Sequence, residues 1–181
     1  MNYDLVWLFG HPLRFRRFIP SAIVTFGGER NVGQCEIAVA WKGASAEEPR
    51  SATLTLMWDV AALQRHYAEI EEELEILRTR DDDRATQVME AAVLVAVAVM
   101  SHVEPGTRFT RRSDTGTRHD YYLNETNDEM IEVAGRWEGG LPGLFEEKRS
   151  QSELNPTLRK RWVSVTIVRG TPRNQTEGLH A

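Results

Sequence analysis

The first 58 residues alternate between short apolar runs and polar turns, a pattern typical of β structure. Apolar runs occupy 21–26 and 35–41, and polar, glycine-containing turns follow each of them. From 51 to 58 the even-numbered positions, ending at Trp58, are apolar and most odd-numbered positions are polar. Such alternation marks a strand with one buried face. We therefore expect three strands in an antiparallel meander.

Two helices are expected after this meander. Between 59 and 79, apolar residues recur at helical spacing behind Asp59, a suitable N-cap. The segment 84–103 is the most apolar of the chain, and residues 91–100 include no polar side chain. A membrane span needs about 20 such residues, so we expect a buried helix and no membrane contact. The alternation at 95–98 leaves a strand as the alternative.

Beyond Pro105 and Gly106, strand-like pieces alternate with one helical piece. Strands are expected at 107–113, 119–123, 130–137 and 161–168, and a helix at 144–154. The first three strands are close in sequence and suit a meander, whereas the helix before the last strand allows a crossover.

Together these elements predict an α+β fold with a mixed central sheet. Its core would follow the order α-β-β-β-α-β and occupy 81–170. An antiparallel β meander and a helix, in 1–80, would precede the core as an N-terminal extension. The polar tail, 171–181, is expected to be flexible.

Composition and charge narrow the class of protein. The net charge is −5, from 27 acidic and 22 basic residues. This argues against nonspecific coating of nucleic acid but allows a local basic groove. The single Cys35 excludes an intramolecular disulfide and a multi-cysteine zinc site. The apolar run at the N-terminus is short and has no basic segment before it, so we expect a cytoplasmic protein.

Two carboxylates stand out in the second predicted meander. If the turn at 124–129 is symmetric about Thr126, Asp120 lies opposite Glu132, with Cβ atoms about 5 Å apart. Two carboxylates at that distance repel each other, and a hard cation such as Mg²⁺ would relieve the repulsion. The alternative is two acids on a solvated sheet face, and a register slip of one residue would separate them.

Three further side chains are candidates for the same site. Glu90 lies in the first turns of the apolar 84–103 helix, where a buried charge is costly unless it is paired. Lys148 and Gln151 are three residues apart and share one face of the 144–154 helix. A lysine there could stabilise charge on a phosphate. The alternative for all three is the exposed surface of their helices.

The order of these residues is more specific than any one of them. A helix with a glutamate, strands with an aspartate and a glutamate, and a helix with a lysine and a glutamine follow the order α-β-β-β-α-β. This arrangement resembles the core of the PD-(D/E)xK, or restriction-endonuclease-like, superfamily, over 84–168. The segments GTRHDYYL, IEVAG, EEKRSQ and WVSVTIV also look like parts of uncharacterised bacterial proteins of similar layout.

The resemblance implies a nuclease that depends on a divalent metal, Mg²⁺ or Mn²⁺. Asp120 and Glu132 would hold the metal, and the carbonyl of Val133 would be an additional ligand. Glu90 would match the acid that many members carry on the first core helix.

The chain departs from the family pattern at two positions. Ala134 stands where the family has a lysine, and His119 replaces the proline before the aspartate. Some members carry the lysine on the following helix, where Lys148 is the candidate. Gln151 is similar to the helix glutamine of some nuclease branches.

Arginines are available where a nucleic acid would need them, and guanidinium groups suit phosphate contacts. The alternative is a set of solubilising surface residues, in a chain with only three lysines among its basic residues. The candidates are Arg108, Arg111, Arg112, Arg118, Arg136 and Arg149.

Two functions therefore stay open. The first is a metal-dependent nuclease that hydrolyses nucleic acid phosphodiesters. The second, which Ala134 favours, is a catalytically inactive nuclease-fold subunit that serves as a binding or assembly module. Its interface with a protein partner or a second copy would be the β-rich N-terminal third. The aromatic residues expected there are Trp7, Phe9, Phe15 and Phe18.

Overall fold

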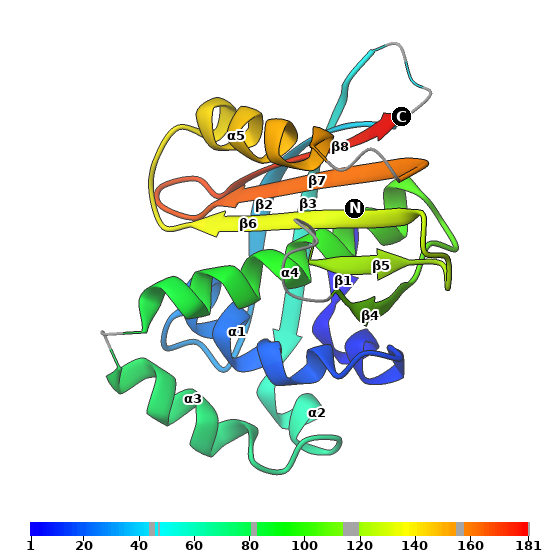
Figure 1. Ribbon diagram of the computed structural model, residues 1–181. Helices are drawn as coiled ribbons and strands as arrows, with labels where there is room; N and C mark the ends of the chain where they lie inside the picture. Colours follow the sequence, from blue (N-terminus) through cyan, green and yellow to red (C-terminus); the bar gives the residue numbers. More distant parts are fainter. Residues whose placement is uncertain (44–45, 47, 81–82, 114–119, 155–157, 181) are drawn as a thin grey trace.

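The computed structural model describes residues 1–181 apart from 44–45, 47, 81–82, 114–119, 155–157 and 181. One mixed sheet of eight strands runs through the described part, and helices lie on both of its faces (Figure 1). The strand order is β1-β3-β2-β8-β7-β6-β5-β4.

The strands are β1 (Asn2–Asp4), β2 (Val32–Lys42), β3 (Arg50–Asp59), β4 (Phe109–Arg112), β5 (Tyr121–Leu123), β6 (Glu129–Arg136), β7 (Lys160–Ile167) and β8 (Arg173–His180). The α-helices are α1 (Ile19–Gly27), α2 (Val60–Gln64), α3 (Ile70–Thr79), α4 (Arg84–Val103) and α5 (Leu141–Glu153). Two short 3₁₀ helices, η1 (Leu5–Gly10) and η2 (Phe15–Phe18), precede α1.

The segment from α4 to β7 has the element order and strand pairing that the sequence predicts. Strands β4, β5 and β6 form an antiparallel meander, and β6 pairs with β7 in parallel. Helix α5 supplies the crossover that a parallel pair requires. It begins at Leu141, earlier than predicted, because Pro142 suits a first helical turn. The prediction of an α+β fold with a mixed sheet is confirmed.

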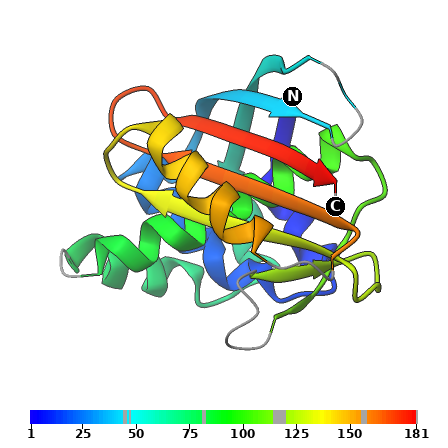
Figure 2. The same ribbon diagram turned by 45° about the horizontal axis from the view of Figure 1, so that its top comes forward.

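Two apolar layers cover the two faces of the sheet. Helices α4 and α1 lie on one face, in a core that includes Val133 and Trp162. Helix α5 lies across β6, β7 and β8 on the other face (Figure 2), in a core that includes Ala134 and Val163. Successive residues of β6 and β7 thus alternate between the two cores. This alternation directs Glu132, two residues before Ala134, toward α5.

Helix α4 is buried along its length, as predicted for 84–103. It is long and apolar enough to cross a membrane, but 67% of its most apolar 18-residue window is buried inside the protein. Every residue from Ala91 to Met100 is buried. Such burial is typical of the core helix of a soluble protein. The alternative of a strand at 95–98 is wrong.

The prediction of a strand at 21–26 is also wrong, because this segment belongs to α1. Ile19, Ile23 and Phe26 recur at helical spacing and are buried, so the apolar run is one face of a helix. Pro20 fits the first turn. The other two strands predicted in this region, β2 and β3, form the expected antiparallel pair.

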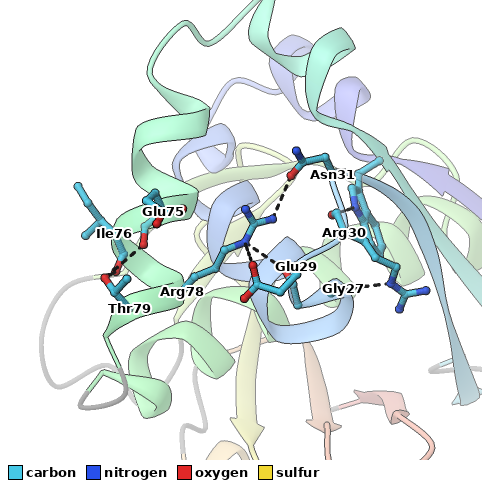
Figure 3. A network of polar contacts seen from close by, with 10 residues as sticks. Gly27, Glu29, Arg30, Asn31, Glu75, Ile76, Arg78 and Thr79 are labelled. Carbon is cyan, nitrogen blue, oxygen red and sulfur yellow. Dashed lines mark hydrogen bonds and ion pairs between the residues drawn. The ribbon is translucent and has the colours of Figure 1, made fainter.

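The single helix predicted over 59–79 is divided into α2 and α3. Helix α3 is fastened to the turn between α1 and β2 by Arg78 (Figure 3). The Arg78 guanidinium donates to the carbonyl of Gly28 at 3.2 Å and to Asn31 Oδ1 at 3.1 Å. It also lies 3.6 Å from the carboxylate of Glu29. Arg78 thereby holds α3 in place, where this helix contributes to a cavity described below.

The tail predicted to be flexible forms β8, a strand in the middle of the sheet. It pairs in parallel with β2 and in antiparallel with β7. Two of its buried side chains, Asn174 and Thr176, are polar but hydrogen-bonded. Asn174 Nδ2 donates to Ser164 Oγ at 3.1 Å and to Thr166 Oγ1 at 3.0 Å, and Asn174 Oδ1 accepts from Thr176 Oγ1 at 2.9 Å. The strand is therefore polar in sequence and buried in structure.

Strand β8 also connects the predicted N-terminal extension to the predicted core. It joins β2, from 1–80, to β7, from 81–170, in one sheet. Buried residues of both segments, such as Ile23 and Leu94, belong to the same apolar core. The two segments thus share one sheet and one core.

Candidate active site

An ion pair between β6 and α5 forms the centre of the candidate site. Lys148 Nζ donates to Glu132 Oε1 at 2.8 Å and to Gln151 Oε1 at 3.0 Å. The side chain of Glu132 is 5% exposed and that of Lys148 is 21% exposed. Lys148 and Gln151 face the sheet from one side of α5, in agreement with their spacing. The structure thus brings three of the candidate residues into contact.

Asp120 lies beside Glu132, immediately before β5. The β5–β6 register pairs Tyr121 with Ile131, and one residue further along it places Asp120 opposite Glu132, as expected from a turn centred on Thr126. Asp120 Oδ2 accepts a hydrogen bond from the backbone amide of Val133 at 2.7 Å. This bond holds the carboxylate against β6.

Both carboxylates hold their protons more tightly than exposed acids do. Burial and the nearby charge of Asp120 raise the pKa of Glu132 to about 7, although Lys148 opposes both effects. Burial also raises the pKa of Asp120, against the opposing effects of the Val133 amide, Lys148 and Arg112. One lysine is therefore not enough positive charge to offset the burial of these two acids.

A cavity of about 750 Å³ opens next to Asp120. Its charged lining residues are Arg17, Glu73, Glu90, Arg112 and Asp120. Glu90 accepts a hydrogen bond from Ser21 Oγ of α1 at 2.5 Å. Burial raises the pKa of Glu90, although the Ser21 bond and the charge of Arg17 lower it. Glu90 therefore shares a cavity with Asp120, while its own hydrogen bond goes to α1.

The candidate arginines are spread over several surfaces. Arg112 borders the cavity. The guanidinium carbon of Arg111 lies 3.7 Å from the ring centroid of Tyr122, and Arg108 lines a separate pocket beside His11. These three residues of the β4 region thus face different surroundings.

Two further candidates, Arg136 and Arg149, do not line the cavity. Arg136 lies 3.1 Å from the carboxylate of Glu147, and Arg149 lies 3.2 Å from that of Glu153. Arg118 falls outside the described residues. Among the candidate arginines that the structure describes, Arg112 is therefore the one best placed to contact a ligand in the cavity.

Two residues of the cavity lining, Tyr121 and, from the N-terminal segment, Arg17, were not predicted from the sequence. Burial, Asp120 and Glu90 together raise the pKa of the Tyr121 hydroxyl to about 12, although Arg112 and Arg17 oppose them. All four charged residues line the same cavity as Tyr121.

Arg17 reaches this place because η2 packs beneath β5. The ring of Phe15, in η2, meets the ring of Tyr121 edge-on at a centroid distance of 5.4 Å. Arg17 is about a hundred residues from Asp120 in the chain, and no motif connects them. Only the packing of η2 brings the arginine to the cavity.

The donor set fits a hard divalent cation with few protein ligands. Mg²⁺ is usually bound through one or two carboxylates and keeps several waters. Asp120, Glu132 and the carbonyl of Val133 supply oxygen donors of this type. Among the described residues, no three Asp, Glu, His or Cys side chains form a group that could hold a metal. A cation at Asp120 and Glu132 would lower the raised pKa values of both acids.

No protein-family model, curated protein or solved structure matched the chain.

Proposed function

We propose that the protein is a divalent-metal-dependent phosphodiesterase that hydrolyses nucleic acid, with a site similar to that of PD-(D/E)xK nucleases. The observation that supports this proposal most is the 2.8 Å contact between Lys148 Nζ and Glu132 Oε1. Ala134 occupies the family's usual lysine position, and this contact places a lysine from α5 beside the acid instead. Asp120, opposite Glu132, is the second carboxylate.

Each side chain has a role in such a reaction. Asp120 and Glu132, with the Val133 carbonyl, would hold Mg²⁺ or Mn²⁺. When bound, the ion neutralises charge on the phosphate and acidifies an attacking water. Lys148 lies between Glu132 and Gln151, where it can stabilise negative charge that develops on the phosphate.

Cleavage of fluorescent DNA and RNA oligonucleotides with Mg²⁺ or Mn²⁺ tests the proposal. We expect metal-dependent cleavage by the wild-type protein. Asp120→Asn and Lys148→Met should each reduce it by about 100-fold, because the first removes a carboxylate that would hold the metal and the second removes the positive charge beside the phosphate. No cleavage with either metal, or equal cleavage by all three proteins, would contradict the proposal.

A matched control comes from a second ion pair that involves β6. Lys160 Nζ lies 3.3 Å from Glu104 and 3.5 Å from Glu129, the first residue of β6. Its side chain is 21% exposed, as is that of Lys148. Lys160→Met therefore removes a comparable lysine, and we expect its cleavage rate to stay within about twofold of the wild type.

A catalytically inactive nuclease-fold subunit is the second candidate function. Lys148 already forms an ion pair with Glu132, which lessens the need for a metal, and Ala134 lacks the family's lysine. Two candidate phosphate ligands, Arg136 and Arg149, are paired with acids. The protein would then bind a protein partner or a second copy of itself. We expect a cytoplasmic location for either function.

Only some of the aromatic residues expected at the interface of such a subunit are accessible to a partner. Phe15 and Phe18 are buried in the core, 2% and 7% exposed, so the expectation that they contact a partner is wrong. Phe9 is partly buried, whereas Trp7 is 57% exposed. Light scattering of the wild type and Trp7→Ala tests this candidate. An assembly that dissociates on substitution supports it, and a monomer in both cases counts against it.

A further inference from the structure

We infer that the 750 Å³ cavity beside Asp120 receives single-stranded nucleic acid, with Arg17 and Arg112 as its phosphate contacts. The inference rests on the proposed function and specifies its substrate class. It assigns a role to the N-terminal segment, which contributes none of the residues proposed to hold the metal and does not contain Lys148.

The size and walls of the cavity favour an unpaired strand. Cavities of roughly 300–1,000 Å³ enclose most of the surface of one small ligand, and this cavity falls within that range at about 750 Å³. Its lining comes from η2, α3, α4, β4 and β5, and includes Phe18, Glu73 and Met89. A base that is stacked and paired in a duplex cannot reach into a cavity of this size, whereas an unpaired base can.

Two arginines line the cavity, and each can contact a phosphate. The charge of Arg112 lowers the pKa of Asp120, and the charge of Arg17 lowers the pKa of Glu90, so each arginine lies near a carboxylate of the cavity. Both arginines are near the Tyr121 hydroxyl. The guanidinium carbon of Arg17 lies 4.8 Å from the centroid of the Phe18 ring. This contact orients the charge at the cavity wall, as expected for a groove that follows a nucleic acid backbone.

The rest of the lining suits a base rather than a free phosphate. Ala85, Met89 and Val93 of α4 provide an apolar wall. Glu73 and Glu90 provide carboxylate oxygens, which can accept hydrogen bonds from the amino groups of a base. A lining that combines an apolar wall, carboxylate acceptors and arginines distinguishes a nucleotide from an inorganic anion.

Binding can be measured by fluorescence anisotropy without metal, so that the result does not depend on hydrolysis. The probes are a labelled single strand and a blunt duplex of the same sequence. We expect the single strand to bind at least about tenfold more tightly, because only unpaired bases can enter the cavity. Equal affinity for the two probes would overturn the inference.

Arg17→Ala tests the phosphate contact, and Arg16→Ala is its matched control. Arg16 is exposed on the same turn of η2, and the cavity is lined by Arg17 instead. We expect Arg17→Ala to weaken single-strand binding by about tenfold. It should also reduce the slope of log affinity against log salt by about 0.7, the value for one phosphate contact. A change in affinity with an unchanged slope would contradict a phosphate contact.

Ala85→Trp fills the cavity from the exposed first turn of α4, and Ala61→Trp adds the same side chain on the exposed surface of α2. Only Ala85→Trp should abolish single-strand binding, and both variants should keep the thermal stability of the wild type.

If binding follows this pattern without metal-dependent cleavage, the inference holds and the proposed hydrolysis fails. If cleavage occurs but neither Arg17→Ala nor Ala85→Trp affects it, the inference fails and the proposed function holds.

Discussion

Glu132 shows how one buried acid depends on its surroundings. It is 4% exposed, so its charge is costly, and Asp120 adds repulsion while Lys148 offsets part of both effects. A proton, the lysine and a bound cation are three ways to neutralise the same carboxylate. The sequence predicted that Asp120 and Glu132 face each other, because hairpin register follows from the turn. It left the Lys148 contact open, since spacing along α5 does not determine which face of the helix meets the sheet.

The stability of the protein should depend on the protonation of Glu132. Its pKa in the folded protein is about 7, above the ordinary value of 4.5, so the folded state binds this proton more tightly than the unfolded state. Raising the pH from about 4.5 to about 7 should therefore lower the free energy of unfolding, by up to about 3 kcal/mol. Urea unfolding of the wild type and Glu132→Gln across this range measures the effect.

In Glu132→Gln this decline should be smaller, because glutamine does not titrate, whereas Asp120 and Glu90, whose pKa values burial also raises, are still present. Glu129→Gln, in the same strand, is the control and should keep the decline of the wild type, because Glu132 is intact. A wild-type curve with the same pH dependence as Glu132→Gln would contradict the raised pKa.

At the scale of elements, the contact between α4 and β6 depends on a glycine that no sequence pattern singled out. A Cβ atom at Gly135 would lie 2.6 Å from the carbonyl oxygen of Val88 and 2.7 Å from the Cβ of Ala92. The absence of a side chain thus allows β6 to approach α4 closely. This approach sets the position of β6 and therefore of Glu132, three residues earlier.

Gly135→Ala should destabilise the protein by about 1–3 kcal/mol, the usual cost of overpacking a core. Thermal unfolding measures the change. The control is Gly143→Ala in α5, where a Cβ would meet no atom within 4 Å. That substitution should raise stability by up to about 1 kcal/mol, because alanine favours the helical conformation more than glycine does. Equal effects of the two substitutions would contradict a tight contact at Gly135.

Element prediction succeeded for α4, whose apolar pattern is long, and failed at 21–26, where the apolar run is short. The 20 residues of α4 carry enough apolar positions to identify a buried helix. The apolar run at 21–26 is too short to separate a helix face from a buried strand, and the packing of Ile19 and Ile23 against α4 selected the helix. Residues that flank the run, including Pro20, were the available sign of a helix.

At the scale of the whole molecule, β8 determines whether the chain forms one sheet. It is hydrogen-bonded to β2 on one side and to β7 on the other. Without it, each of these strands would have an unpaired edge inside the sheet. The last strand of the chain therefore completes the fold that its first strands begin.

A chain that ends at Gly170 should lose cooperative unfolding and form aggregates, because two central strands lose their partner. Circular dichroism and size-exclusion chromatography measure both changes. Adding a peptide of residues 171–181 should restore a folded species, which would show that pairing with β8, rather than chain length, is the cause. A truncated chain with the melting temperature of the wild type would contradict this role of β8.

The sequence by itself determined the order α-β-β-β-α-β, the burial of α4 and the opposed positions of Asp120 and Glu132. These features depend on local periodicity and on turn symmetry, and both involve residues that are close together in the sequence. The tertiary structure decided the central place of β8, the contact of Lys148 with Glu132 and the presence of Arg17 at the cavity. Each of these joins segments far apart in the chain. In β8, moreover, hydrogen bonds among buried polar side chains replace the apolar pattern by which a strand is recognised in sequence.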